Sequence, residues 1–360
     1  MVDKTRLKNA WEDILSLFLE KALSLRFDIC TCELCQKRMM ELLLKQFSPF
    51  YIEEGSSNFE EIKKRLVKEN SKKLFIEIEK VIEEVSKNLP HSTWEDKEKE
   101  FDMLLKKIKD DRGIDFSRYH RRILKRRIAL RLVAHRLSSY TEYLKILAQD
   151  PSEYSELFEV LTINVSEFFR DIEVWGSLKK ILERIIERNN LENTPIVMWS
   201  AGCAEGEEPY SLSILMQEID RIKTSLIIYA TDIDEKALEE ARLAGYNSDV
   251  LKNVDEEILK KYFEFSQGKY YLKEEAKRPV KFKYLDLTSS ETIKNVDLII
   301  CRNVFIYFTK PLQEQILNKF YYSLKEEGYL VMGKTEILPK EAKVIFREVD
   351  AENRIYQKMG

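Results

Sequence analysis

The stretch that decides the fold is residues 196–211, IVMWSAGCAEGEEPYS. Its apolar start, Ile196–Trp199, predicts a buried parallel strand. Gly202 and Gly206 predict a tight turn from this strand into a helix, and Pro209 suits an early position in that helix. A turn of this kind usually binds a nucleotide-type cofactor at the carboxyl end of an α/β sheet.

The charges of this turn indicate which cofactor to expect. Glu205, Glu207 and Glu208 would surround a pyrophosphate with negative charge, and the spacing is G-x-x-x-G rather than G-x-G-x-x-G. A cationic nucleoside without phosphate fits better, and S-adenosylmethionine (SAM) is one. An ordinary loop with solvated glutamates is the alternative that this stretch alone leaves open.

Length and composition limit the class of protein. A chain of 360 residues predicts two or three domains, and its net charge of −3 gives no reason to expect a polyelectrolyte role. No apolar stretch approaches the roughly 20 residues that span a bilayer, and the N-terminus lacks an apolar signal core. The five cysteines are too unevenly spread for a secreted disulfide framework. We expect a cytoplasmic protein without membrane insertion.

The pattern of apolar residues divides the chain into three parts. Helical spacing predicts an all-helical domain over residues 1–92, ending near Pro90, and a second helical domain over 93–165. Strands and helices alternate over 166–360, which predicts a doubly wound α/β sheet. The expected strands are Ile196–Trp199, Leu226–Ala230, Val280–Tyr284, Val296–Ile300, Gly328–Gly333 and Arg354–Lys358. The expected helices between them are Pro209–Lys223, Asp234–Ala244 and Pro311–Leu324.

A basic run marks the second helical domain. Between Arg118 and Arg136 the chain contains many basic residues and no acid. Apolar residues keep helical spacing among them, so one face of the helix should pack and the other should be basic. An acidic partner is favoured over the alternative of a solvated face, because a solvated face normally mixes both signs.

Polar residues follow the other expected strands. Asp232 ends the second strand, where an acid would accept hydrogen bonds from ribose hydroxyls, although it could instead only cap the turn. Asp234 is expected to cap the next helix. Asp286 ends the third strand, where it could accept from the adenine amino group, and Asn303 follows the fourth. Neighbouring Cys203 and Cys301 are expected to be packed thiols rather than nucleophiles.

Five motifs in order carry a family resemblance. They are RRILKRRIALRL, LTINVSEFFRD, SAGCAEGEEPYSL, ATDIDEKALEEARLAGYN and CRNVFIYF. Over about residues 95–360 the chain resembles the chemoreceptor glutamate methyltransferases, the CheR family. The resemblance implies a class I SAM-dependent methyltransferase domain, with a Rossmann-like doubly wound sheet and a small inserted antiparallel subdomain near 246–283. An all-α domain would precede it.

The resemblance also assigns residues to roles. Arg170 and Tyr307 would lie near the transferred methyl, although a structural ion pair is the alternative for Arg170. The cofactor contacts would be Asn164, Ser166, Arg170, Glu207, Asp232, Asp286, Leu287 and Asn303, and Gly202 of the glycine turn is expected to join them. The family often has Asn at the position of Asp286 and Thr at that of Ser166. The arginines of the basic run would dock the cytoplasmic helical domain of chemoreceptors: Arg121, Arg122, Arg126, Arg127 and Arg131.

The function implied is that of a protein-glutamate O-methyltransferase, which forms glutamate methyl esters in chemotactic adaptation. A glutamate with a pKa of about 4.3 is already ionised at neutral pH, so no general base is needed. One alternative is a nucleic-acid methyltransferase, but the balanced charge and the lack of an aromatic basic channel speak against nucleic acid as a partner. Another is a non-catalytic SAM-sensing scaffold regulated by the N-terminal domain.

Residues 1–92 carry a separate signal. Cys30, Cys32 and Cys35 form C-x-C-x-x-C, a density typical of metal thiolates, although a closed zinc site needs a fourth ligand such as His91 or a group from another subunit. Free thiols are the alternative. The segment also resembles the ComFB family, small helical proteins, which implies a regulatory role through homodimer formation or binding of a cyclic dinucleotide.

Overall fold

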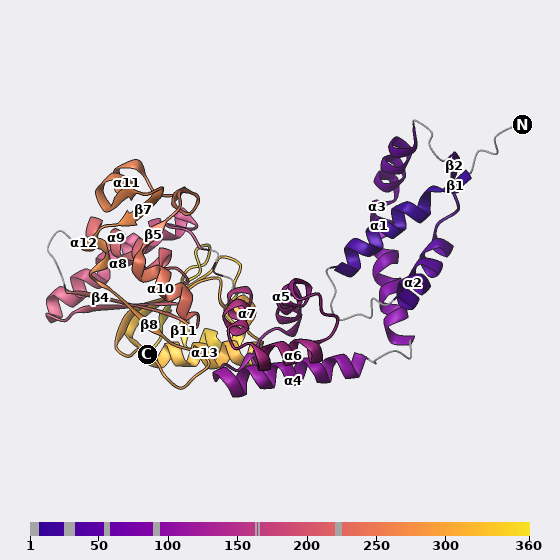
Figure 1. Cartoon of the computed structure of the whole chain (residues 1–360). Coiled ribbons are helices and arrows are strands. Elements are labelled where there is room, and N and C mark those ends of the chain that lie inside the picture. The colour runs from indigo at the N-terminus through magenta and orange to yellow at the C-terminus, as the bar shows by residue number, and fades with distance from the viewer. Residues whose placement is uncertain are drawn as a thin grey trace, which may run out of the picture. The chain divides into compact units, whose positions relative to one another are not determined.

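A computed structural model describes residues 7–24, 33–53, 58–88, 94–162, 164, 166–219 and 225–360 (Figure 1). The chain divides into two compact units, which are described separately. The first comprises Met1–Arg112 and Arg121–Glu153, and the second comprises Gly113–His120 and Tyr154–Gly360. None of the described helices combines the length and the apolar character that crossing a bilayer requires.

The N-terminal part of the first unit is mainly helical, as expected. It contains α1 (Ala10–Ser24), α2 (Glu33–Gln46) and α3 (Phe59–Asn88). Two short strands, β1 (Leu7–Asn9) and β2 (Tyr51–Glu53), pair in antiparallel fashion and were not expected from the sequence. The apolar stripes of the three helices form one core from this part of the chain, which includes Trp11, Leu15, Met39, Leu43, Leu74 and Ile82.

The rest of the first unit contains α4 (Trp94–Arg112), α5 (Arg121–Ala134) and α6 (Tyr140–Gln149). The basic run forms α5. Leu124, Ile128 and Leu132 are buried, which confirms that one face of this helix packs.

The second unit is built on a seven-stranded sheet with the order β11-β12-β10-β9-β3-β4-β8. Five strands run parallel to one another, β12 is antiparallel to β10, and β11 is antiparallel to β12. Their bounds are β3 (Ile196–Ala201), β4 (Leu226–Asp232), β8 (Val280–Tyr284), β9 (Val296–Cys301), β10 (Leu324–Met332), β11 (Phe346–Asp350) and β12 (Ile355–Lys358). All but β11 were expected from the sequence.

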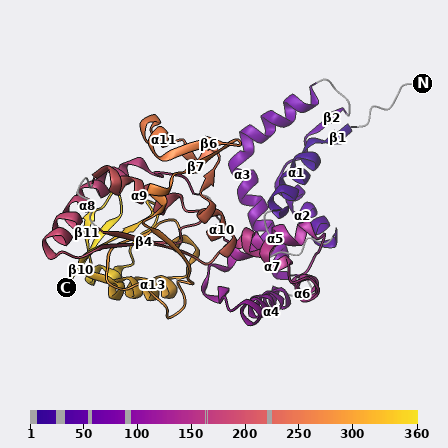
Figure 2. The same cartoon turned by 60° about the vertical axis from the view of Figure 1, so that its left-hand side comes forward.

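Helices cover both faces of this sheet, which confirms the doubly wound prediction (Figure 2). Residues of α13 (Lys310–Ser323) pack with Trp199, Ile299 and Leu330 on one face. Residues of α8 (Ile172–Glu192) and α9 (Glu207–Ile219) pack with Met198 and Ile300 on the other. Near the carboxyl end of β4, α10 (Glu235–Leu243) begins, and α7 (Glu153–Leu161) precedes the sheet in the chain. Helix α8 was not among the helices expected from the sequence.

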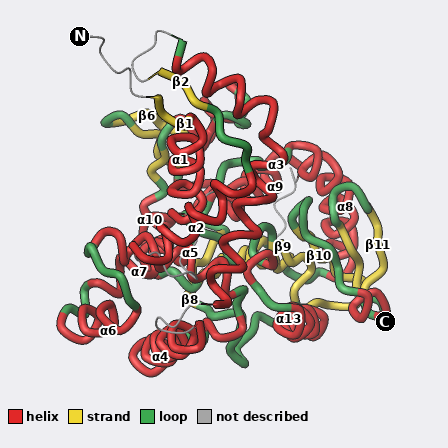
Figure 3. The backbone as a smooth tube through the Cα atoms, turned by 90° about the vertical axis from the view of Figure 1, so that its right-hand side faces the viewer, coloured by secondary structure: helices red, strands yellow, loops and turns green. Residues whose placement is uncertain are grey.

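A small antiparallel sheet is inserted between α10 and β8. It has the order β5-β7-β6, with β5 (Gly245–Tyr246), β6 (Phe263–Ser266) and β7 (Lys269–Leu272). Two helices flank it, α11 (Glu256–Tyr262) and α12 (Glu274–Lys277), and Figure 3 shows β6 apart from β8, β9 and β10. The expected end of this subdomain at residue 283 is wrong, because Val280–Tyr284 pairs in parallel with β4 and so belongs to the main sheet.

The main sheet has two outer strands, β8 and β11. Lys281 and Lys283 are exposed on β8, and Arg347 and Glu348 are exposed on β11.

Candidate active site

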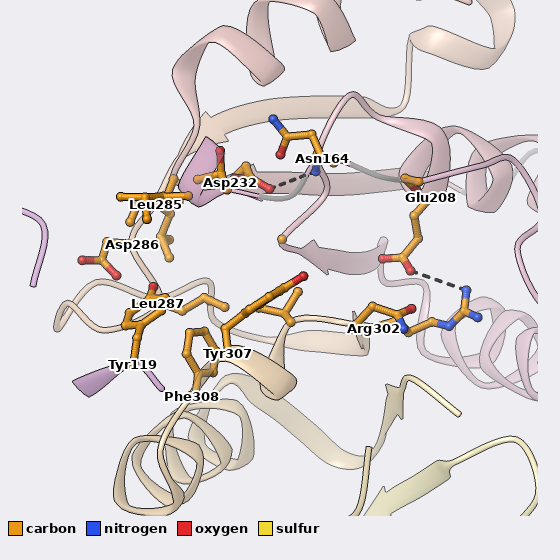
Figure 4. A pocket seen from close by; sticks show the side chains of 18 of the residues that line it. Tyr119, Asn164, Glu208, Asp232, Leu285, Asp286, Leu287, Arg302, Tyr307 and Phe308 are labelled. Carbon is orange, nitrogen blue, oxygen red and sulfur yellow. Dashed lines mark hydrogen bonds and ion pairs between the residues drawn. The ribbon is translucent and has the colours of Figure 1, made fainter. Parts of the chain in front are cut away.

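A pocket lies where β3, β4, β8 and β9 end (Figure 4). It brings together nine residues that the sequence assigned to the cofactor or to catalysis, although they come from five separate stretches of the chain. They are Asn164, Ser166, Arg170, Gly202, Asp232, Asp286, Leu287, Asn303 and Tyr307.

The glycine turn after β3 forms one wall of the pocket. Gly202 has a φ of +82°, and its N–H donates to the carbonyl of Thr231 at 2.8 Å. A Cβ at this position would lie 2.5 Å from Cγ2 of Val304. Both the backbone conformation and the lack of space therefore require glycine here.

Asp232 supports this turn and also faces the pocket. Its carboxylate accepts the N–H of Ala204 at 2.9 Å through Oδ2 and the N–H of Asp234 at 3.0 Å through Oδ1. Burial raises the pKa of Asp232. Each carboxylate oxygen has two acceptor positions, so hydrogen bonds to the turn leave room for ligand hydroxyls. Capping and ligand binding therefore do not exclude each other.

Asp234 caps α10 as predicted, since its Oδ1 accepts the N–H of Ala237 at 3.2 Å. Its other oxygen accepts from Thr162 Oγ1 at 2.7 Å and from Asn164 Nδ2 at 2.8 Å. Asp234, which caps α10, thus also fixes the side chain of Asn164, which lies far earlier in the chain.

The glutamates of the turn differ in their surroundings. Glu208 lines the pocket, and it accepts from Ser200 Oγ at 2.7 Å and faces Arg302 Nη1 at 3.8 Å (Figure 4). Glu207 is only 1% exposed and is not among the lining residues. Its Oε2 is buried without a hydrogen-bond partner in the described part of the chain, and burial raises its pKa to about 8. The cofactor contact of Glu207 stays a prediction.

Arg302 contacts both Glu208 beside the glycine turn and the LTINVSEFFRD motif that precedes the sheet in the chain. Beyond Glu208, it pairs with Asp171 and donates to the carbonyl of Arg170 at 3.0 Å. Trp175 Nε1 donates to the same carbonyl at 3.0 Å. The backbone that carries Arg170 into the pocket is thus fixed at its carbonyl.

The loop after β8 carries Asp286 and Leu287. The carboxylate of Asp286 accepts from the N–H of Thr288 at 2.7 Å and from its hydroxyl at 2.8 Å. Lys319 of α13 donates to the carbonyls of Leu287 at 2.7 Å and Glu291 at 3.1 Å. These contacts hold the loop against the helix that covers this face of the sheet.

An aromatic wall of the pocket was not predicted. Phe116 and Tyr119 line it, and the Tyr119 ring packs edge-to-face on Phe308 with 5.0 Å between ring centroids. The N–H of His120 donates to the carbonyl of Tyr307 at 2.8 Å. These residues precede the first cofactor motif by more than 40 positions, and two aromatics at the start of the basic run were the available signal.

The donor set of this pocket fits SAM. Carboxylate and amide oxygens suit ammonium and hydroxyl groups, the apolar and aromatic walls suit an adenine, and Gly202 lines the pocket without a side chain.

Comparison with known proteins identifies the family. Residues 164–355 match the model described as the CheR methyltransferase, SAM binding domain, and residues 99–162 match the CheR methyltransferase, all-alpha domain. The first match alone covers more than half of the chain. The chain belongs to the CheR methyltransferase family. Its second unit accordingly has the class I SAM methyltransferase fold.

Named relatives agree with this assignment. The chain is 33% identical over 249 residues to a chemotaxis protein methyltransferase of Borreliella burgdorferi, which covers 66% of this chain and 88% of the relative. It is also 33% identical over 242 residues to a chemotaxis protein methyltransferase of Listeria innocua, covering 67% and 91% respectively.

The basic helix of this CheR-family chain is less free than its sequence indicates. Arg121 pairs with Glu98 at 2.5 Å and Asp102 at 2.6 Å, and Arg131 pairs with Glu153 at 2.7 Å. Arg127 is half-buried, whereas Arg122 and Arg126 are exposed. Acids from other helices therefore neutralise part of the run, and Arg122 and Arg126 are the predicted docking residues that face solvent.

The cysteines fall into two groups. Cys203 and Cys301 are buried, and burial raises the pKa of both thiols, which confirms them as packed thiols. Cys35 is also buried, while Cys30, Cys32 and His91 lie outside the described residues. No cluster able to hold a metal occurs among the residues that the structure describes.

Proposed function

We propose that this CheR-family chain transfers the methyl group of SAM to glutamate side-chain carboxylates of chemoreceptors and forms methyl esters. The observation that carries the proposal is the convergence of Asn164, Arg170, Asp232, Asn303 and Tyr307 on one pocket. The two CheR family models that match the chain, and the chemotaxis methyltransferases among its relatives, support the proposal.

Bound SAM would supply an electrophilic methyl group on a sulfonium sulfur. Asp232 would accept from the ribose hydroxyls, Asp286 and Leu287 would meet the adenine, and Asn164, Ser166 and Asn303 would complete the contacts. Arg170 and Tyr307 line the same pocket and would donate hydrogen bonds that orient the acceptor carboxylate. Because that carboxylate is already ionised, the protein needs to align it and exclude water rather than remove a proton.

We further propose that Arg122 and Arg126 dock an acidic segment of the receptor's helical domain. Both are exposed on α5, and a partner bearing carboxylates would lose little hydration on meeting two exposed guanidinium groups.

The direct test is incubation of the full chain with methyl-tritiated SAM and membranes that contain chemoreceptors. We expect label in receptor protein that alkali releases as methanol, because methyl esters hydrolyse readily. Alkali-stable label would contradict the ester, and binding of S-adenosylhomocysteine without any transfer would favour the non-catalytic scaffold. An Asp232→Ala variant serves as the control that should lose both binding and transfer.

For residues 1–92 we propose a ComFB-like regulatory module, acting through homodimer formation or a cyclic dinucleotide, with zinc bound by Cys30, Cys32 and Cys35. The well-formed core around Trp11 and Met39 supports an independent domain. Metal analysis of the full chain beside a Cys32→Ser variant tests the zinc. Less than stoichiometric zinc in both proteins would rule the site out.

A further inference from the structure

Glu336 is a buried carboxylate that the proposed chemistry does not use. It follows β10 and is 3% exposed. Its Oε1 accepts the N–H of Phe305 at 2.8 Å, and its Oε2 accepts the N–H of Gly333 at 2.6 Å. The backbone N–H groups of Asn303 and Ile306 also lie near this carboxylate and favour its charged form.

The donors Phe305 and Gly333 belong to two loops that follow neighbouring parallel strands, β9 and β10. The loops approach each other closely at Gly333. A Cβ there would lie 2.8 Å from Oε2 of Glu336 and 2.9 Å from the backbone nitrogen of Asn303. The carboxylate therefore links the two loops, because each of its oxygens accepts a backbone N–H from a different loop.

The loop after β9 is the one that needs such support. It carries Asn303 and Tyr307 into the pocket, and Asn303 has a φ of +62°. A residue other than glycine adopts this conformation at a cost, so the surroundings must hold it in place. The N–H of Phe305, which Glu336 accepts, lies in this loop, and the N–H groups of Asn303 and Ile306 lie near the same carboxylate.

We propose that Glu336 is a positioning residue whose carboxylate fixes the turn from Asn303 to Tyr307 in the shape that cofactor and acceptor require. This inference rests on the proposed function of the same pocket. A carboxylate is needed because both oxygens accept from N–H groups. Glutamine would place an NH₂ group opposite at least one donor and leave that donor unsatisfied.

The test compares Glu336→Gln with Asp297→Asn in the full chain. Asp297 is a matched control, since it is a fully buried carboxylate at the opposite end of β9. It accepts the N–H of Val197 at 2.8 Å and pairs with Arg188 at 2.5 Å and Lys325 at 2.9 Å. Both variants should lose stability, but only the first should disturb the pocket.

We expect Glu336→Gln to weaken S-adenosylhomocysteine binding at least tenfold by calorimetry and to lower kcat at least tenfold. Asp297→Asn should keep wild-type values for both at a temperature where it is folded. Glu336→Asp retains the charge and should recover part of the affinity, and it provides the comparison if Glu336→Gln does not fold.

Wild-type affinity and kcat in Glu336→Gln, or equal losses in Glu336→Gln and Asp297→Asn, would overturn the inference. If Glu336→Gln does not fold, wild-type affinity and kcat in Glu336→Asp would also overturn it. Failure of the proposed function is distinguishable, because the wild-type chain would then fail to bind S-adenosylhomocysteine or to transfer methyl groups.

Discussion

Gly202 offers the sharpest single-residue test of the pocket. Gly202→Ala should weaken S-adenosylhomocysteine binding at least tenfold, because the new Cβ would lie 2.5 Å from Val304 and push that side chain or the turn aside. Gly268→Ala is the matched control. Gly268 has a φ of +81°, almost the same as Gly202, but a Cβ there meets nothing within 4 Å. If calorimetry gives both variants the same affinity as wild type, the close approach of Gly202 to Val304 does not affect cofactor binding.

Glu207 predicts a dependence of stability on pH. Burial raises its pKa from 4.5 to about 8, so between these values the folded protein holds a proton that the unfolded chain has lost. The free energy of unfolding of the wild type should therefore fall as pH rises through this window. Glutamine does not titrate, so the free energy of unfolding of Glu207→Gln should not fall in this way. Between pH 5 and pH 9 its stability should therefore rise relative to that of the wild type by a few kcal/mol, at about 1.4 kcal/mol per pKa unit.

Denaturant unfolding of both proteins at pH 5 and pH 9 measures this difference. Glu257→Gln, at an exposed position, should show the same pH dependence as wild type. A constant stability difference between Glu207→Gln and wild type at both pH values would show that Glu207 does not titrate as expected.

Helix α5 predicts a separation of docking from cofactor binding. Arg122→Glu combined with Arg126→Glu should raise KM for receptor-containing membranes about tenfold or more, because the exposed charge reverses, while S-adenosylhomocysteine affinity stays unchanged. The effect should shrink at high salt, which screens exposed charges. Lys145→Glu makes the same kind of charge reversal at an exposed position on α6 and serves as the control. If the wild type, the double arginine variant and Lys145→Glu all had the same KM, the receptor would not dock through Arg122 and Arg126.

The elements that the sequence predicted are those with a strong local pattern. All six residues of β9 are buried, so its apolar run was readable, whereas β11 is short and exposes Arg347 and Glu348, so nothing marked it as a strand. The end of the inserted subdomain was misjudged because the family resemblance gave only an approximate bound, which overlapped the strand expected at Val280–Tyr284; pairing with β4 assigns that strand to the main sheet.

The residues of the candidate site likewise fall into those that the sequence predicted and those that it did not. Asp232 and Asn303 were predictable because polar residues at the ends of buried strands stand out. Tyr119 and Glu336 were not, since their importance comes from contacts with residues more than 30 positions away, Phe308 in one case and Phe305 in the other. The ion pairs of Arg121 and Arg131 were equally hidden, because their acids lie outside the basic run.

For the whole chain, the two family models leave residues 1–98 unmatched. Among the residues that the structure describes, the hydrophobic core of the N-terminal part draws on residues between Ala10 and Val85. We therefore expect a chain that begins at residue 93 to bind S-adenosylhomocysteine as the full chain does. Calorimetry of both proteins tests this, with circular dichroism as the check on folding. A folded but non-binding shortened chain would show that the N-terminal domain supports the pocket directly.

The two outer strands of the main sheet have a consequence for solubility. An open edge exposes unpaired backbone groups that can recruit a strand from another molecule and start aggregation. Lys281 and Lys283 on β8, and Arg347 and Glu348 on β11, place charges along both edges. Any incoming strand would have to desolvate these charges, so they protect a large, mostly parallel sheet from growing between molecules.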